Sequence, residues 1–264
     1  MSQFTPLSGY PQVLARGDNR VPWTTQPQHP VALTPPFARP NCGAFLPSVG
    51  WIVPALGAVT QSVTNAAYTD VRFPVTSYGR SLRVYADDFG NDDDQFVWPK
   101  TIPSAAAGAF TTVLVLTGIS TGNYQWVTRD SGHLLAIGNG DDPSYLASGY
   151  YGGNGSNYYY EGSLSGLDTY TGRHTFVIST KPGALTIVHN GQIVTPNNGF
   201  PQWVGDGSLA ATCIPDISGV PYTNYYHFNG HVYLWACLPG VFLAESAALE
   251  VSVNPWSLFA PLPA

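Results

Sequence analysis

The chain has 264 residues, a formal net charge of −6, and charged residues at only 10% of its positions. Hydrophobic residues make up 44% of the chain, which is enough for a buried core and excludes a protein that is disordered throughout. Three Glu and two Lys are too few for a long-helix or coiled-coil protein, whereas 28 Gly, 23 Pro and 16 Tyr are typical of short strands joined by many turns.

The charge pattern also limits the partners. No run of Lys and Arg could neutralise phosphates, so we expect neither a nucleic-acid partner nor membrane insertion. The longest apolar stretch, residues 49–59, is short and is interrupted by Pro54. The first residues lack the basic and apolar regions of a secretory signal. Cys42, Cys213 and Cys237 are widely spaced, which favours buried thiols in a reducing cytosol over a zinc site or a disulfide framework.

Proline dominates the beginning of the chain. Residues 1–40 contain eight prolines, a spacing that no helix and no central strand tolerates. A solvated linker would not carry aromatic residues, so we expect an extended arm that docks on a neighbouring protein. Four aromatic residues are the expected anchors: Phe4, Tyr10, Trp23 and Phe37. Residues 41–76 are expected to form a connector with one or two strands.

From residue 77 onward the pattern predicts many strands with a recurrence typical of a β-sandwich or barrel. The predicted strands are residues 81–85, 94–98, 110–117, 124–129, 133–137, 145–151, 157–160, 174–179, 185–189, 208–213, 225–228 and 231–238. The near-continuous apolar run 110–117 is typical of a central strand. Asn190-Gly191 predicts a tight hairpin. One short helix is predicted over residues 243–251, and Trp256 and Phe259 are expected to close the core at the chain end.

Several of these segments together resemble a known family. The runs GRHTFVIST and LTIVHNGQIV, the triplet Phe228-Asn229-Gly230 before a long strand, the short helix and Asn254-Pro255-Trp256 resemble a laminin-G-like, concanavalin A-like domain. The closing pattern is similar to such domains in bacteriophage and prophage structural proteins. The resemblance covers roughly residues 77–260. It implies an all-β fold, an antiparallel jelly-roll sandwich over residues 77–264, in a family whose members often bind glycans and sometimes Ca²⁺.

The densest charge cluster is a candidate metal site. Five carboxylates fall within eight positions, and four of them are the expected Ca²⁺ ligands: Asp87, Asp88, Asp92 and Asp94. Carboxylate oxygens in a loop suit Ca²⁺. The alternative is a solvated turn, because Asp is also a preferred turn residue. The solvated turn is favoured, so no cofactor is expected unless this segment binds Ca²⁺.

Tyrosines and small polar residues mark a candidate binding surface. It consists of Tyr150, Tyr151, Asn154, Tyr158, Tyr159 and Tyr160. Tyrosine offers flat, amphipathic contact area at low entropy cost, which suits sugar stacking or a protein interface. The alternative is ordinary strand packing. Because only alternate residues of a strand face one side, three consecutive tyrosines cannot all be buried in the same core.

No catalytic motif stands out. Glycoside hydrolysis needs two carboxylates flanking the scissile bond, and no Glu in the sequence alternates with Asp along a predicted strand. We therefore expect a non-catalytic bacteriophage virion protein, anchored by its arm and exposing a lectin-like domain. A tail appendage that takes part in host adsorption is favoured, with a head decoration protein and a polysaccharide depolymerase as alternatives. The expected partners are other virion proteins, further copies of the chain (a trimer favoured) and a host surface glycan.

Overall fold

The computed structural model describes residues 31–40, 42–53, 57–59, 73–84, 96–97, 102–103, 109–118, 125–129, 133–139, 142–151, 157–163, 172–181, 184–194, 212–213, 216–217 and 230–261. For the strands of the smaller sheet it gives the backbone pairing.

The larger sheet has nine strands, all paired antiparallel. In spatial order they are β17 (Gln192–Ile193), β16 (Ala184–His189), β15 (Arg173–Lys181), β10 (Phe110–Thr117), β20 (Gly230–Pro239), β2 (Gly43–Leu46), β3 (Gly50–Val53) and β4 (Gly57–Val59), with β7 (Leu82–Val84) also paired to β20.

The smaller sheet has six strands. Their order is β14 (Asn157–Ser163), β13 (Asp142–Tyr151), β12 (His133–Asn139), β11 (Gln125–Arg129), β19 (Asp216–Ile217) and β8 (Phe96–Val97). Three two-strand pairs complete the β-structure: β1 (Val31–Leu33) with β21 (Phe259–Pro261), β9 (Ile102–Pro103) with β18 (Thr212–Cys213), and β5 (Val75–Thr76) with β6 (Gly79–Arg80).

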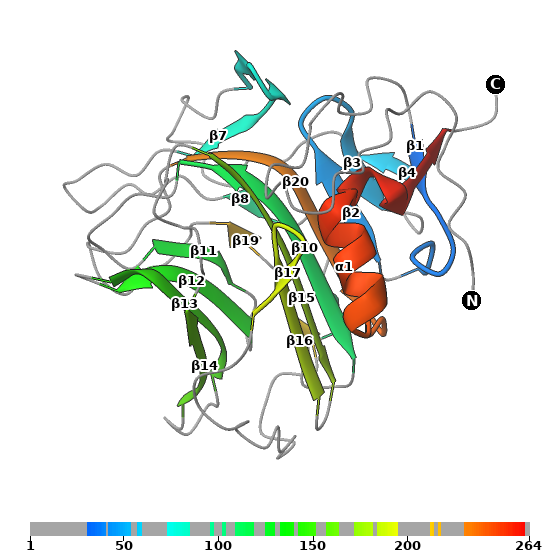
Figure 1. Ribbon diagram of the computed structural model, residues 1–264. Helices are drawn as coiled ribbons and strands as arrows, with labels where there is room; N and C mark the ends of the chain where they lie inside the picture. Colours follow the sequence, from blue (N-terminus) through cyan, green and yellow to red (C-terminus); the bar gives the residue numbers. More distant parts are fainter. Residues whose placement is uncertain are drawn as a thin grey trace.

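The elements form layers. Strands β11 to β14 face one side of the larger sheet, and the helix α1 (Glu245–Val253) covers the other side (Figure 1). The predicted all-β, antiparallel sandwich is therefore confirmed. In the part of the chain that is described, no helix is long and apolar enough to cross a membrane.

Strand β10 is the centre of the larger sheet, as its sequence predicts. All eight of its residues are buried, and it pairs with β15 on one side and β20 on the other. A strand covered on both faces needs apolar or internally bonded side chains at every position. Its polar residues meet this condition: the hydroxyl of Thr111 lies 2.8 Å from that of Ser179 and donates to the carbonyl of Val241 at 2.9 Å.

The predicted Asn190-Gly191 hairpin is also confirmed. Both residues have positive φ, 48° and 77°, and they join β16 to β17. The turn rests on the helix, because the backbone N–H of Gly191 donates to the Ser252 hydroxyl at 2.9 Å. A Cβ atom at Gly191 would lie 3.0 Å from a methyl carbon of Val253. The local turn signal thus also fixes where α1 docks.

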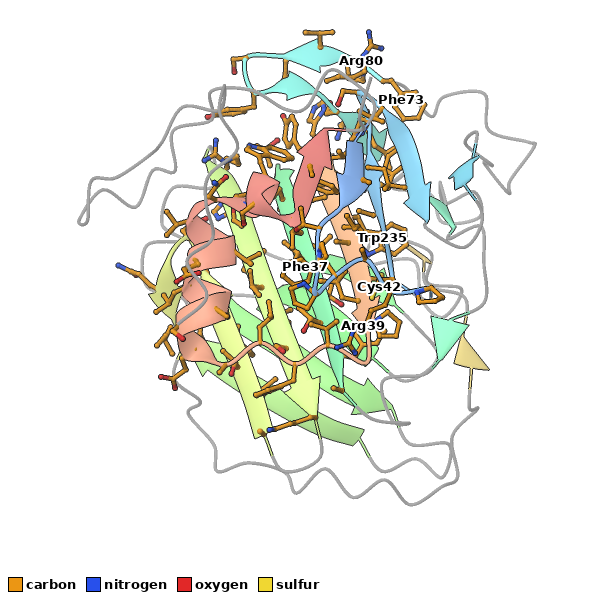
Figure 2. All side chains as sticks on the ribbon, turned by 90° about the vertical axis from the view of Figure 1, so that its right-hand side faces the viewer. Phe37, Arg39, Cys42, Phe73, Arg80 and Trp235 are labelled. Carbon is orange, nitrogen blue, oxygen red and sulfur yellow. The ribbon has the colours of Figure 1, made fainter. Side chains whose placement is uncertain are left out.

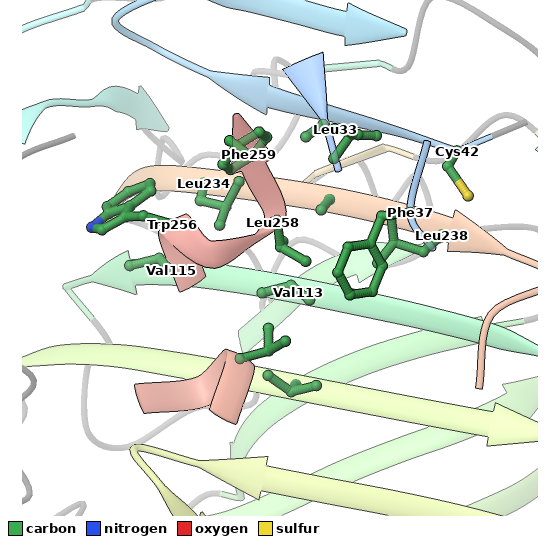
Figure 3. Close-up of a cluster of buried hydrophobic side chains, with 14 of the residues drawn as sticks. Leu33, Phe37, Cys42, Val113, Val115, Leu234, Leu238, Trp256, Leu258 and Phe259 are labelled. Atoms are coloured by element: carbon green, nitrogen blue, oxygen red, sulfur yellow. The ribbon is translucent and has the colours of Figure 1, made fainter. Parts of the chain in front are cut away.

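The end of the chain closes the main hydrophobic core. Leu258 and Phe259 follow the helix and the short 3-10 helix η2 (Pro255–Leu258), and they pack over β10 and β20 with Trp256 and Leu33 (Figure 3). Trp256 and Phe259 are 8% and 1% exposed, which confirms their predicted role. The helix begins two residues later than expected: its N-cap Ala244 has extended backbone, and the N–H of Leu243 donates to the Ser179 hydroxyl at 2.6 Å.

Two expectations about the N-terminal part are wrong. Phe37 was expected to anchor the chain to a neighbour, but it is 1% exposed and belongs to the core of its own domain. Residues 41–76 were expected to be a connector with one or two strands, but β2 pairs with β20, β3 with β2 and β4 with β3, so these strands belong to the larger sheet. Strand β1 pairs with β21 as well, so the sandwich begins near residue 31 rather than 77. Cys42 and Cys237 are buried, as predicted.

Candidate functional site

The β13–β14 hairpin brings the predicted tyrosines together. Tyr150 lies directly opposite Tyr158 in the ladder, and β14 is the last strand of the sheet on this side. Neighbouring positions of a strand belong to opposite faces. The position of Tyr160 therefore shares one face with Tyr150 and Tyr158, and the positions of Tyr151 and Tyr159 share the other.

The register extends this division across the whole smaller sheet. Two adjacent rows of directly paired residues run from β8 to β14, and they belong to opposite faces. One row, here called the apolar row, contains Phe96, Ile217, Thr128, Leu135, Ser148 and Tyr160. The other, here called the charged row, contains Val97, Asp216, Arg129, Leu134, Gly149 and Tyr159.

The remaining predicted site residues lie outside the described residues. These are Asn154 of the tyrosine surface, the four expected Ca²⁺ ligands Asp87, Asp88, Asp92 and Asp94, and the arm anchors Phe4, Tyr10 and Trp23. Among the residues that are described, no three His, Cys, Asp or Glu side chains come together in a way that could hold a metal.

A second cluster, which the sequence did not reveal, lies at one end of the larger sheet. Four directly paired residues cross strands β15, β10, β20 and β7 and form what is here called the basic row: Arg173, Thr117, His231 and Arg83. Three of the four carry basic groups, and Arg173, His231 and Arg83 are all partly exposed. Arg80, on the adjoining hairpin, is exposed and lies at this end of the molecule (Figure 2).

Tyr233 contacts several residues next to the basic row. Its hydroxyl lies 3.0 Å from the hydroxyl of Thr76 and 3.4 Å from that of Thr117. Its ring meets the ring of Tyr78 edge to face, with centroids 6.1 Å apart and planes at 82°. The guanidinium carbon of Arg173 lies 5.9 Å from the centre of the Tyr78 ring, a cation–π distance. The β5–β6 hairpin is thereby fixed against the end of the sheet.

The basic groups are held by local hydrogen bonds. The Nδ1 atom of His231 lies 2.8 Å from the Ser81 hydroxyl, and Arg83 donates to the carbonyl of Gly230 at 3.1 Å. Burial lowers the pKa of His231, and the charge of Arg83 lowers it further, so the imidazole is neutral at pH 7. Burial also lowers the pKa of Arg173, to about 8, which leaves the guanidinium protonated at pH 7.

The basic row was missed because its members are far apart in the sequence. The only local signal is the alternation of polar and apolar residues at His231, Val232 and Tyr233, which marks one face of a strand. The pairing of β7, β10 and β15 with this strand depends on contacts between distant segments. No property of the individual strands predicts that Arg83 and Arg173 belong to one row.

Comparison with known proteins gives a likeness at the level of the fold. No protein-family model matches the chain, and no curated protein sequence matches it. The binding domain of botulinum neurotoxin serotype G is similar in structure, with a TM-score of 0.52 and 10% sequence identity over 80% of this chain and 50% of that one. The CBM40 domain of the Ruminococcus gnavus IT-sialidase gives a TM-score of 0.44 and 9% identity over 55% and 83% of the two chains. The chain thus has a concanavalin A-like, lectin-type β-sandwich fold.

Proposed function

We propose that this chain is a non-catalytic, glycan-binding protein of a bacteriophage virion, exposed on a tail appendage and used in host adsorption. The observation that carries the proposal is the register of the smaller sheet. It gives the tyrosines of β13 and β14 two different faces, one in the charged row and one in the apolar row.

The composition of the two rows indicates which face of the smaller sheet is the outer one. Arg129 and Asp216 lie directly opposite each other in the charged row. Charged residues are rarely fully buried, whereas Phe, Ile and Leu are typical of positions on the inner face of a sandwich. On this pattern we assign the charged row, and with it the positions of Tyr151 and Tyr159, to the outer face of the sheet.

Tyrosines on the last two strands of a sheet suit a saccharide. An aromatic ring stacks on the apolar face of a sugar, and its hydroxyl bonds to sugar hydroxyls. Each ring contributes on the order of 1–2 kcal/mol, so two rings support only weak binding. Repeated copies of the chain on a particle would turn this weak binding into firm attachment, which fits the expected homo-oligomer.

The virion role is supported by the sequence. The order of the hairpin, the Phe228-Asn229-Gly230 triplet, the helix and Asn254-Pro255-Trp256 is similar to domains in phage structural proteins. A tyrosine-rich, lectin-like domain favours adsorption over head decoration. The positions of the glutamates favour a non-catalytic role, because Glu245 and Glu250 lie on α1 and Glu161, on β14, is paired with Ala147 rather than with a second carboxylate.

Labelling of phage particles with an antibody against the purified chain tests the placement. We expect label on the tail, and we expect the purified chain to slow adsorption by competing for the host surface. Label over the head would favour a decoration protein. Release of reducing ends from host polysaccharide by the purified chain would favour the depolymerase alternative.

A further inference from the structure

The basic row places two arginines and one neutral histidine in a single row of an acidic protein. The whole chain has ten Lys and Arg residues and a net charge of −6. Even so, Arg173, His231 and Arg83 occupy three of four consecutive places in one row. Neighbouring strands lie about 4.8 Å apart, so the backbones of Arg173 and Arg83 lie about 14 Å apart at the two ends of the row, and only their long side chains can approach one ligand between them.

We infer that the basic row is a subsite for the negatively charged group of an acidic saccharide, with Tyr78 as the adjacent surface for the sugar ring. This inference rests on the proposed glycan-binding function and adds the chemical class of the sugar. It also places this part of the binding surface on the larger sheet, apart from the tyrosines of β13 and β14.

The chemistry of the row matches such a group. Guanidinium groups bind carboxylate, sulfate or phosphate oxygens through a planar fork of N–H donors. Arg173 is already held beside the Tyr78 ring, at 5.9 Å from its centre, so it loses little side-chain freedom on binding. Two hydroxyls lie at the same end of the sheet: that of Thr117 contacts the Tyr233 hydroxyl, and that of Ser81 contacts His231.

The surroundings of Arg173 strengthen the case. A partly buried cation is poorly hydrated, so an anion that arrives beside it interacts more strongly than at a fully exposed arginine. The same burial lowers the pKa of Arg173, and a bound anion would raise that pKa again. An acidic sugar would therefore interact with both Arg173 and Tyr78, whereas an uncharged sugar would interact with Tyr78 alone.

The test compares acidic sugars with neutral counterparts, using the full-length chain and isothermal titration calorimetry. Suitable pairs are sialyllactose with lactose, and an oligogalacturonate with its methyl ester. We expect each acidic member to bind at least about tenfold more tightly than its neutral partner. Arg173→Gln should remove most of this preference. The control is Lys181→Gln, which loses the same charge at the exposed far end of the same strand, about 27 Å away.

Each result decides the question. Equal binding of acidic and neutral sugars, or equal binding by the two variants, overturns the acidic subsite and leaves the proposed glycan function standing. Failure of every sugar in the panel to bind overturns both. If Arg173→Gln loses stability in urea with no change in acidic preference, the row serves packing within the chain and the subsite is overturned.

Discussion

The imidazole rings of His174 and His189 stack inside the sandwich, with Nδ1 of one ring 3.0 Å from Nε2 of the other. Their centroids lie 5.2 Å apart with planes at 15°, and Phe176 stacks on His189 at 4.6 Å. A hydrogen bond between two ring nitrogens needs one donor and one acceptor, so at least one ring must be neutral. Burial, together with the charge of a neighbouring basic group, lowers the pKa of His174 to about 4 and that of His189 to about 3.

This pair predicts a loss of stability in mild acid. Both pKa values are lower in the folded protein than the ordinary value of 6.5. The unfolded chain therefore binds more protons below about pH 6.5, and the free energy of unfolding falls as the pH falls toward 4. Each histidine should remove about 2 kcal/mol between pH 7 and pH 5. Urea unfolding at several pH values measures this slope.

The variant His189→Phe should reduce that slope by about half, because one titrating group is lost while the stacked ring is kept. The window from pH 7 to pH 5 lies above the ordinary pKa values of carboxyl groups, so histidines dominate it. An unfolding free energy that stays constant over this window, or a slope that His189→Phe leaves unchanged, would contradict the assignment.

Phe37 provides a test of where the domain begins. It is buried against the closing segment of the chain, so Phe37→Ala should remove about 3–4 kcal/mol from the free energy of unfolding. The control is Val75→Ala, because Val75 is 72% exposed and its truncation should change stability little. A fully stable Phe37→Ala protein that no longer enters particles would instead restore the anchoring role.

The hairpin at Gly191 is a second test of the packing. Gly191→Ala should lower stability by about 1–2 kcal/mol, because φ is 77° and the added methyl would press on Val253. Thermal unfolding of this variant can be compared with Ser246→Ala, which changes an exposed position of α1. Equal melting temperatures for Gly191→Ala and the unchanged protein would show that the turn does not fix the docking of the helix.

Local signals predicted much of the sandwich. The dipeptide Asn190-Gly191 predicts a turn with positive φ at both residues, and the apolar run of β10 predicts a strand that is covered on both faces. The pairing of β1 with β21 could not be read in the same way. Its partners Leu33 and Phe259 are 226 positions apart, and the prolines that follow Leu33 conceal a short strand within an extended arm.

For the candidate site, too, the features that are local in the sequence could be predicted and those that depend on strand pairing could not. The tyrosines of β13 and β14 are close in the sequence, so their composition and alternation mark them as a surface. The basic row is built by register across four strands, and a shift of one residue in any strand would move its member to the other face. Composition predicts a lectin-like surface, whereas only tertiary pairing places Arg173 and Arg83 together.

The most direct test of the account measures binding of the full-length chain to purified host surface polysaccharide. It compares two double variants, Tyr151→Ala with Tyr159→Ala, and Tyr150→Ala with Tyr158→Ala. We predict that the first loses at least about tenfold in affinity with little change in melting temperature, and that the second loses stability. Unchanged binding by the first variant, or loss of binding without loss of stability by the second, would contradict a glycan surface on the face of the charged row.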